Sequence, residues 1–230
     1  MRRSQVWAAI AYERARLGGD AESAALRALA EFTSVNRNDV LETEQAVYND
    51  TAMRVSASRW AAQPRSAPLA RQPSVVTVAG APGETCVMLV DAKNDEHHPL
   101  ARRCTYAIVW AQSATVNREG NAVALAVQPL EAWRELWVFR KRGAAWAIDV
   151  MPPASVDPLV GYVEFAGWVP GGRQMLVARE ARGDGKYRRS FEIVSLDSMA
   201  STRQTSDAAQ LGSFRKWEDP QWKRMTVSMR

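Results

Sequence analysis

The sequence predicts a mainly β protein that begins with an α-helical region. Three observations lead to this prediction. Apolar residues recur at helical spacing over 1–60, prolines are spaced through 61–73, and short apolar runs separated by glycine and proline turns fill 74–230. We therefore expect a helical region, a linker and a β domain with these boundaries. At 230 residues, of which 47% are hydrophobic, the chain is long and apolar enough to form a folded core.

The first 60 residues predict a small antiparallel group of helices. Residues 4–17 carry apolar side chains near one helical face, and two glycines end that helix. Asp20 is placed to cap a second helix. A capping-box pattern predicts a third helix over 39–48, and a shorter helical piece is expected over 51–60.

The linker is predicted from its prolines. Pro64, Pro68 and Pro73 lie among alanines, arginines and glutamines. Prolines at that spacing do not fit a helix or a central strand, so an extended segment is expected. This is the clearest domain boundary in the chain.

The most informative part of the β domain is 165–196. Trp168 leads into a Pro-Gly-Gly turn, an apolar run follows, and a polar loop with Gly-Asp-Gly separates it from a second apolar run. This order predicts strand, tight turn, strand, hairpin loop and strand. We expect residues 174–178 to pair with 191–196 as an antiparallel hairpin.

A weaker copy of the same pattern lies upstream, in residues 106–139. Aligning Gly120 with Gly172 gives an offset of 52 residues. Residues 122–127 are then expected to pair with 135–139 as an equivalent hairpin. An internal repeat of this length is typical of propellers and other arrays.

The turn sequence at 168–173 resembles the blade motif of TolB-like β-propellers, which reads Trp-Ser-Pro-Asp-Gly-Lys and leads into a strand. Valine replaces the serine and glycine replaces the aspartate, while the other positions fit. The resemblance, which extends to WD-type propellers, implies about two blade-like units in the C-terminal half. A β-sandwich is the alternative fold. The N-terminal helical region shows no such resemblance.

Two such units do not close a propeller, which typically has about four to eight blades. Three arrangements remain open. The chain is the C-terminal part of a larger propeller, or it forms a small open β domain, or it completes its sheets by self-association. A final partial unit is expected over 214–229, ending in a strand at 224–229.

Cys86 and Cys104 are the only cysteines, and they lie on strands expected at 85–90 and 104–110. We expect these strands to be neighbours, with the two Cα atoms within about 7 Å, the limit for a disulfide. A disulfide would stabilise the fold by about 3 kcal/mol and would imply an oxidising compartment. Two small buried thiols are the alternative.

The sequence indicates no catalytic, cofactor or metal site. His97 and His98 are the only histidines and lie together in a polar loop. Cys104 lies in an apolar run, not on the strained turn that a Cys–His hydrolase requires. Motifs of serine hydrolases, phosphate-binding loops and helical zinc sites are absent from the sequence. Several aromatic residues could line a cleft, but we assign them to the core; they are Tyr106, Trp110, Trp137, Trp146, Tyr162 and Trp168.

The chain is basic, with a net charge of +5. Of its 30 basic residues, 25 are arginines, and they are spread along the chain. No pattern of basic and aromatic residues accompanies them, so nucleic-acid binding is not favoured. The densest group lies at the predicted hairpin loop, where Arg179, Arg182, Arg188 and Arg189 are candidate contacts for an unknown protein partner, through paired hydrogen bonds to carboxylates.

The sequence contains no segment that is typical of a membrane span or of a signal peptide. No apolar run approaches the roughly 20 residues that a membrane span needs, and Glu13 and Arg14 interrupt the apolar N-terminal stretch, so no signal peptide is expected. The location is expected to be periplasmic if the true N-terminus is missing and cytoplasmic otherwise. The resemblance implies a non-catalytic interaction module. The alternative is an accessory propeller of a hydrolase whose catalytic domain lies outside this chain.

Overall fold

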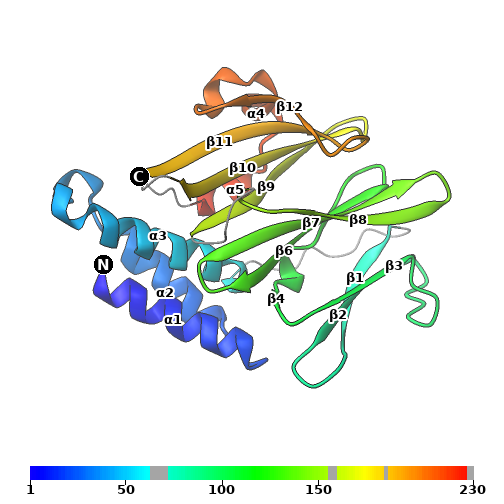
Figure 1. Cartoon of the computed structure of the whole chain (residues 1–230), viewed down its shortest axis with the longest axis horizontal. Helices are drawn as coiled ribbons and strands as arrows, with labels where there is room; N and C mark the ends of the chain where they lie inside the picture. Colours follow the sequence, from blue (N-terminus) through cyan, green and yellow to red (C-terminus); the bar gives the residue numbers. More distant parts are fainter. Residues whose placement is uncertain (63–71, 155–159, 184–185, 227–230) are drawn as a thin grey trace.

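The computed structural model describes residues 1–62, 72–154, 160–183 and 186–226. N-terminal helices are followed by antiparallel sheets, and the described strands form no closed propeller (Figure 1). The predicted fold class, mainly β with an N-terminal helical region, is confirmed. Among the described residues no helix is long and apolar enough to cross a membrane. The expected linker falls mostly on residues outside this description.

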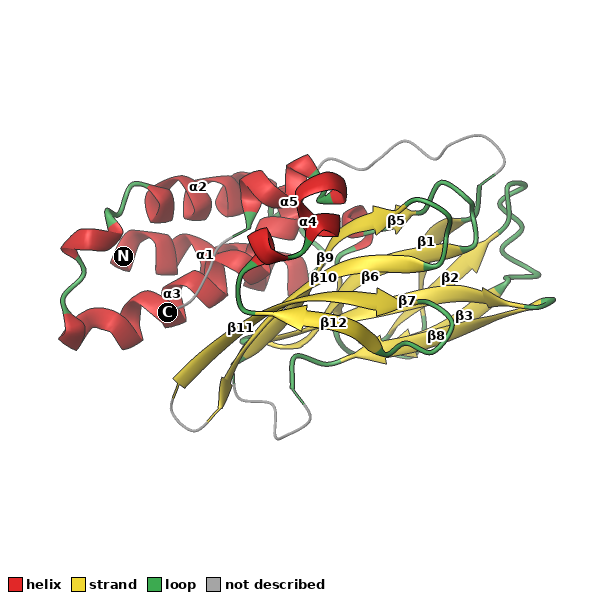
Figure 2. Cartoon of the chain, turned by 90° about the horizontal axis from the view of Figure 1, so that it is seen from above, coloured by secondary structure: helices red, strands yellow, loops and turns green. Residues whose placement is uncertain are grey.

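Three helices form the N-terminal region and lie side by side at one end of the strands (Figure 2). They are α1 (Arg2–Arg16), α2 (Glu22–Thr33) and α3 (Gln45–Ser58). Their contacts consist largely of alanines, such as Ala11 and Ala25, which are fully buried and allow the helices to approach closely. The side chain of Asp20 accepts a hydrogen bond from the Glu22 amide at 2.9 Å, next to the start of α2.

The third helix differs from its prediction. The segment expected to begin it forms two 3₁₀ turns, η1 (Arg37–Asp39) and η2 (Glu42–Glu44). The α3 helix then runs through both helical pieces that the sequence separated, and η3 (Arg59–Ala62) follows it. Burial explains the continuity, because most of α3 is enclosed by the other elements and tertiary packing overrides the weak local signal.

A small sheet follows, in the order β1-β2-β3. Its strands are β1 (Ser74–Ala79), β2 (Thr85–Val90) and β3 (Ala101–Thr105). The strand expected at 104–110 is divided, because the chain passes from the small sheet to the large one at this point. The hydroxyl of Thr105 accepts a hydrogen bond from the Ala107 amide at 3.0 Å, which fixes the bend.

The remaining strands form two antiparallel meanders within one nine-stranded sheet. The first meander comprises β4 (Ile108–Val109), β5 (Thr115–Val116), β6 (Ala122–Leu130), β7 (Trp133–Arg142) and β8 (Ala145–Met151). The second comprises β9 (Gly161–Val169), β10 (Gln174–Gly183), β11 (Lys186–Ser195) and β12 (Ser201–Thr205). A short parallel pairing of β7 with β9 joins them.

Both predicted hairpin pairings are confirmed. In the first meander Val127 lies opposite Glu135, and in the second Ala178 lies opposite Phe191. The Pro-Gly-Gly turn connects β9 to β10, as expected. Turn chemistry and alternation of apolar residues were sufficient to place these pairs.

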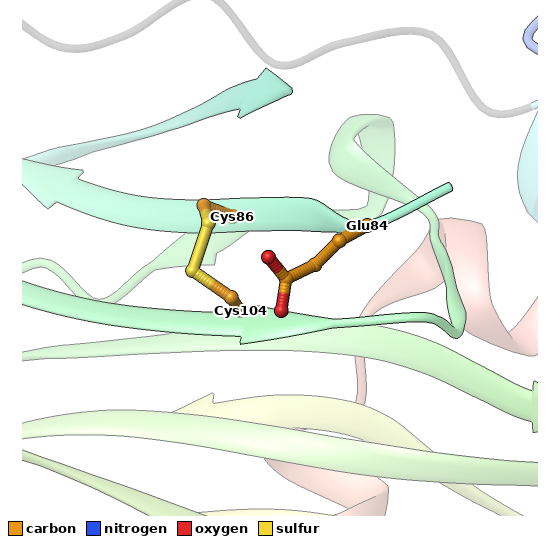
Figure 3. Close-up of side chains that lie close together, drawn as sticks. All are labelled: Glu84, Cys86 and Cys104. Atoms are coloured by element: carbon orange, nitrogen blue, oxygen red, sulfur yellow. A yellow bond between two sulfur atoms is a disulfide. The ribbon is translucent and has the colours of Figure 1, made fainter. Parts of the chain in front are cut away.

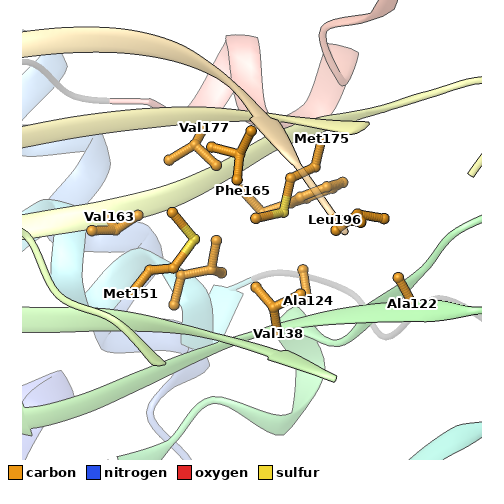
Figure 4. Packing of buried hydrophobic residues seen from close by; sticks show 11 residues of the cluster. Ala122, Ala124, Val138, Met151, Val163, Phe165, Met175, Val177 and Leu196 are labelled. Atoms are coloured by element: carbon orange, nitrogen blue, oxygen red, sulfur yellow. The ribbon is translucent and has the colours of Figure 1, made fainter. Parts of the chain in front are cut away.

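The layers pack face to face. Side chains such as Leu89, Leu125 and Trp137 fill the space between the small sheet and the first meander. Met151 and Val163 belong to a second cluster, which joins the two meanders (Figure 4). Three β layers are thus stacked, and most of the aromatic residues considered for a cleft are core residues: Trp110, Trp137 and Tyr162 are buried, Trp146 and Trp168 are half-buried, and Tyr106 is exposed.

The C-terminal segment contradicts its prediction as a partial β unit. It forms α4 (Gly212–Trp217) and α5 (Pro220–Met225), which cover the outer face of the second meander. The Asp219 side chain accepts hydrogen bonds from the amides of Gln221 and Trp222, at 2.7 and 2.9 Å, and Pro220 occupies the first helical turn. This capping chemistry outweighs the β-like residues that follow. Residues 227–230 of the expected strand lie outside the described part.

Gly167 on β9 makes close contact with the segment between these two helices. Its φ is +153°, and an added Cβ would overlap the carbonyl oxygen of Trp217 and lie 3.1 Å from the Asp219 amide nitrogen. Replacing Gly167 by alanine is expected to lower the free energy of unfolding by about 1–3 kcal/mol, since backbone atoms cannot move aside cheaply. Urea unfolding measures this. The matched control is Gly212→Ala, where the added Cβ meets nothing within 4 Å; equal losses in both variants would contradict the close contact.

Candidate functional site

The most deeply buried charges of the described chain meet at Glu164, in the middle of β9. One carboxylate oxygen lies 2.8 Å from the guanidinium of Arg59 and 2.7 Å from that of Arg134. The hydroxyl of Ser56 donates a hydrogen bond to the same oxygen at 3.1 Å. The other oxygen accepts hydrogen bonds from the Trp222 indole at 2.7 Å and the Thr226 hydroxyl at 3.0 Å.

The donors come from parts that are far apart in sequence. Ser56 and Arg59 lie at the end of α3 and in η3, Arg134 lies on β7, and Trp222 lies on α5. Glu164 therefore sits where the N-terminal helices, both meanders and the C-terminal helices meet. We call this set of six residues the Glu164 cluster.

The charges of the neighbouring arginines keep the carboxylate of the Glu164 cluster ionised. Burial alone would raise the pKa of Glu164, but the charges of Arg59 and Arg134 outweigh it and lower the pKa to about 2. Burial lowers the pKa of Arg134 to about 10, against the opposing attraction of Glu164. Glu164 and Arg134 are thus both ionised near neutral pH, and the guanidinium of Arg59 lies beside the same carboxylate.

This arrangement joins elements and cannot receive a solute. The side chains of Glu164 and Arg134 have no solvent exposure, and that of Arg59 has 1%. Arg59 also lies over the ring of Trp60, with its guanidinium carbon 4.0 Å from the ring centroid. A buried carboxylate with this many donors is a structural anchor. The sequence signal that could have found it is a single glutamate within an otherwise apolar strand.

A second buried carboxylate lies on the same face of the second meander. The hydroxyl of Tyr162 donates a hydrogen bond to Glu180 at 2.7 Å, and the guanidinium of Arg189 lies 4.0 Å from that carboxylate. Burial, together with the charge of Glu164, raises the pKa of Tyr162 well above its ordinary value. The phenol therefore stays protonated and acts as a fixed donor within the core.

The four arginines expected at the hairpin have different environments. Arg179 pairs with Glu192 at 2.9 Å and donates to the Pro152 carbonyl at 2.6 Å. Arg189 packs over the ring of Phe191, at 4.7 Å from its centroid. Two others are exposed, namely Arg182 and Arg188. Arg182 lies over the ring of Tyr187, 6.0 Å from its centroid. Arg179 and Arg189 are thus the less exposed members of the predicted contact set, and Arg182 and Arg188 are the exposed ones.

Cys86 and Cys104 lie directly opposite one another on β2 and β3 and form a disulfide, with their Cα atoms 3.8 Å apart. This places them as the sequence predicts. The guanidinium of Arg102 donates to the Cys86 sulfur at 3.3 Å, and the side chain of Glu84 lies beside the sulfurs (Figure 3). The three side chains are close enough to hold a metal ion, but sulfurs bonded to each other are not thiolate ligands.

The histidines lie apart from any buried site. His98 is 86% exposed, and its ring nitrogen lies 2.9 Å from the carboxylate of Asp95. The hydrogen bond from His98 lowers the pKa of Asp95. His97 also has an exposed side chain. This agrees with the expectation of exposed loop histidines.

The open hollow with the most distinctive lining lies between the edge strands β3 and β8. It has a volume of about 380 Å³ and is lined by Ala101, Arg102, Arg103, Trp146 and Ile148. We call it the β3–β8 groove. Its floor is apolar and its two charged residues are both cations. The guanidinium of Arg103 lies over the Trp137 ring, 4.8 Å from the centroid, at the inner side of the groove.

A second open hollow, of about 400 Å³, lies on the outer surface of α1 and α2. Its lining includes Trp7 and Arg27, whose guanidinium lies 4.7 Å from the Trp7 ring centroid, and also Glu31. Because a cation and an anion both lie at this site, it has no clear preference for a charged ligand. None of the residues that line this second hollow belongs to a β-strand.

The sequence matches no family model, no curated protein and no solved structure. The resemblance to TolB-like propeller blades therefore rests on the motif and repeat within residues 106–196.

Proposed function

We propose that the chain is a non-catalytic, β-propeller-like module that binds a partner protein. The observation that supports this most is the stack of three β layers, whose outer strands each have one edge without a described neighbour. Among the described strands, β1, β3, β8 and β12 each pair along one side only. Free strand edges can pair with a strand of another protein, and apolar and arginine side chains are common at protein interfaces.

The placement of the titratable groups supports binding rather than catalysis. The carboxylate with the most strongly perturbed pKa, Glu164, is enclosed by its donors and has no access to solvent. Asp149 and Glu192 are each paired with an arginine, at 2.6 and 2.9 Å. A carboxylate with a perturbed pKa indicates an active site when it lines a cleft, whereas Glu164 is enclosed and anchors the fold.

The exposed hairpin arginines provide a test of the proposal. Replacing Arg182 and Arg188 together by alanine is expected to leave the melting temperature within about 2 °C, since exposed substitutions change stability by about 0.5 kcal/mol or less. Capture of the native partner, measured by cross-linking and mass spectrometry in extracts of cells that make the chain, is expected to weaken. Arg189 is not included, because its packing on Phe191 would mix a stability effect into the result.

The matched control replaces Arg142 and Arg203, which are also exposed and lie on other strands. Loss of one specific, stoichiometric partner in the hairpin variant but not in the control supports the proposal. Equal capture by both variants removes the hairpin from the interface. Turnover of esters, peptides or phosphoesters by the purified chain would contradict the non-catalytic assignment.

A further inference from the structure

The first meander is wider than the small sheet that covers it. The cover consists of three strands, whereas the meander presents β8 beyond β7 on the same face. The register places Trp146, Ile148 and Val150 of β8 opposite residues of β7 that include Phe139 and Trp137 of the covered core. These β8 side chains remain only half-buried. The small sheet therefore has no strand that covers β8.

The edge of the small sheet beside this place is open. Among the described strands, β3 pairs with β2 alone and β8 pairs with β7 alone. The two strands lie next to each other along the side of the β stack (Figure 2). The β3–β8 groove between them thus combines a free backbone edge with an apolar floor of Trp146 and Ile148.

We propose that the β3–β8 groove binds an extended acidic segment of the partner protein, which adds to β3 as a fourth strand. This rests on the proposed function. The main-chain groups of β3 supply hydrogen bonds, and alternate side chains of the segment face inward, where apolar residues cover Trp146 and Ile148. Side chains at the intervening positions face outward beside Arg102, where carboxylates pair with its guanidinium.

Charge selects this occupant over a second copy of the chain. Arg102 and Arg103 are exposed, and their contacts are with uncharged groups: Arg102 donates a hydrogen bond to the Cys86 sulfur at 3.3 Å, and Arg103 lies over the Trp137 ring, 4.8 Å from its centroid. Two copies joined edge to edge through β3 would bring these arginines together, and like charges on neighbouring strands are destabilising. An acidic strand instead places carboxylates beside these arginines, which is electrostatically favourable.

A synthetic peptide of seven alternating valine and glutamate residues, labelled with fluorescein, tests this with the intact disulfide-bonded chain. Fluorescence anisotropy is expected to show saturable binding, and a peptide with lysine in place of glutamate is expected to bind at least tenfold more weakly. The double variant Arg102→Glu with Arg103→Glu is expected to weaken binding of the glutamate peptide at least tenfold. Trp146→Ala is expected to weaken it through loss of the apolar floor.

The matched control is Arg203→Glu on β12, an exposed arginine on an edge strand away from the groove, which should leave the affinity unchanged. Hydrogen exchange on the unmodified chain gives a second measurement that needs no variant. The amides of Ala101–Thr105 are expected to become protected when the glutamate peptide is added.

Equal binding of the two peptides, protection at β1 or β12 instead of β3, or dimerisation of the free chain with protection of β3 would each overturn the inference. The proposed function fails separately from it. A native partner that is captured equally well by the Arg102→Glu, Arg103→Glu variant leaves the interaction module in place and excludes only this groove.

Discussion

Replacing Glu164 by alanine is expected to lower the free energy of unfolding by about 3–5 kcal/mol, the usual cost of breaking a buried ion pair by removing one partner. This loss of stability is expected because two buried guanidinium groups would remain without their carboxylate partner. Arg59 and Arg134 are both enclosed, and without the carboxylate they would face each other with no compensating charge. The indole of Trp222 and the hydroxyl of Thr226 would lose their acceptor as well.

Urea unfolding followed by tryptophan fluorescence measures this loss. The matched control is Glu13→Ala, which removes a carboxylate paired with Arg16 at 2.8 Å on the exposed face of α1. Exposed pairs of this kind contribute about 0–1 kcal/mol, so the control should be nearly neutral. A Glu164→Ala variant as stable as the control would mean that the buried ion pair does not anchor the elements.

Lowering the pH is also expected to reduce the free energy of unfolding, by protonating Glu164. The pKa of Glu164 is about 2 in the folded chain, against an ordinary value of 4.5. Because the folded pKa is the lower one, its stabilising contribution is complete above the unfolded pKa and is lost as the pH falls from about 5 to about 2. A shift of this size corresponds to about 3 kcal/mol. Glu164→Gln, which keeps the shape but cannot ionise, should show a shallower loss of stability over this range.

Local sequence signals were sufficient for the β-hairpins and the cysteine pair. Strand pairing at Val127 and Ala178 follows from alternation and turn residues, which act over a few positions. The opposed positions of Cys86 and Cys104 follow from two adjacent strands joined by one loop. Each of these predictions depends on neighbouring residues along the chain, and these are the signals that a single sequence contains.

The lone glutamate of an apolar strand was the one sequence signal for the Glu164 cluster, and its partners could not be predicted because only tertiary packing brings them together. Arg59 and Trp222 approach the same carboxylate from opposite ends of the chain. The same limit applies to the β3–β8 groove, whose Arg102 and Trp146 come from different sheets. The hairpin shows an intermediate case, because the sequence located its arginines but could not tell which of them, such as Arg179, would bind within the fold.

Removing the disulfide is expected to produce the second largest loss of stability. The bond closes a sequence separation of 18 residues between β2 and β3, and a loop of this length stabilises the fold by about 3 kcal/mol on the chain-entropy account. The variant is Cys86→Ala with Cys104→Ala, and the same loss is expected when a reductant is added to the unmodified chain. The free energy of unfolding in urea, with and without dithiothreitol, measures both.

The loss should be concentrated at the edge of the small sheet. Of the described strands only β2 pairs with β3, so the disulfide links an outer strand to that neighbour. Hydrogen exchange in the double alanine variant is expected to rise at Ala101–Thr105, while the amides of β10, deep in the second meander, serve as the internal control. Reduction should also weaken binding of the valine–glutamate peptide, since the wall of the β3–β8 groove is this same strand. A reduced chain with unchanged exchange at β3 would show that strand pairing alone holds the edge in place.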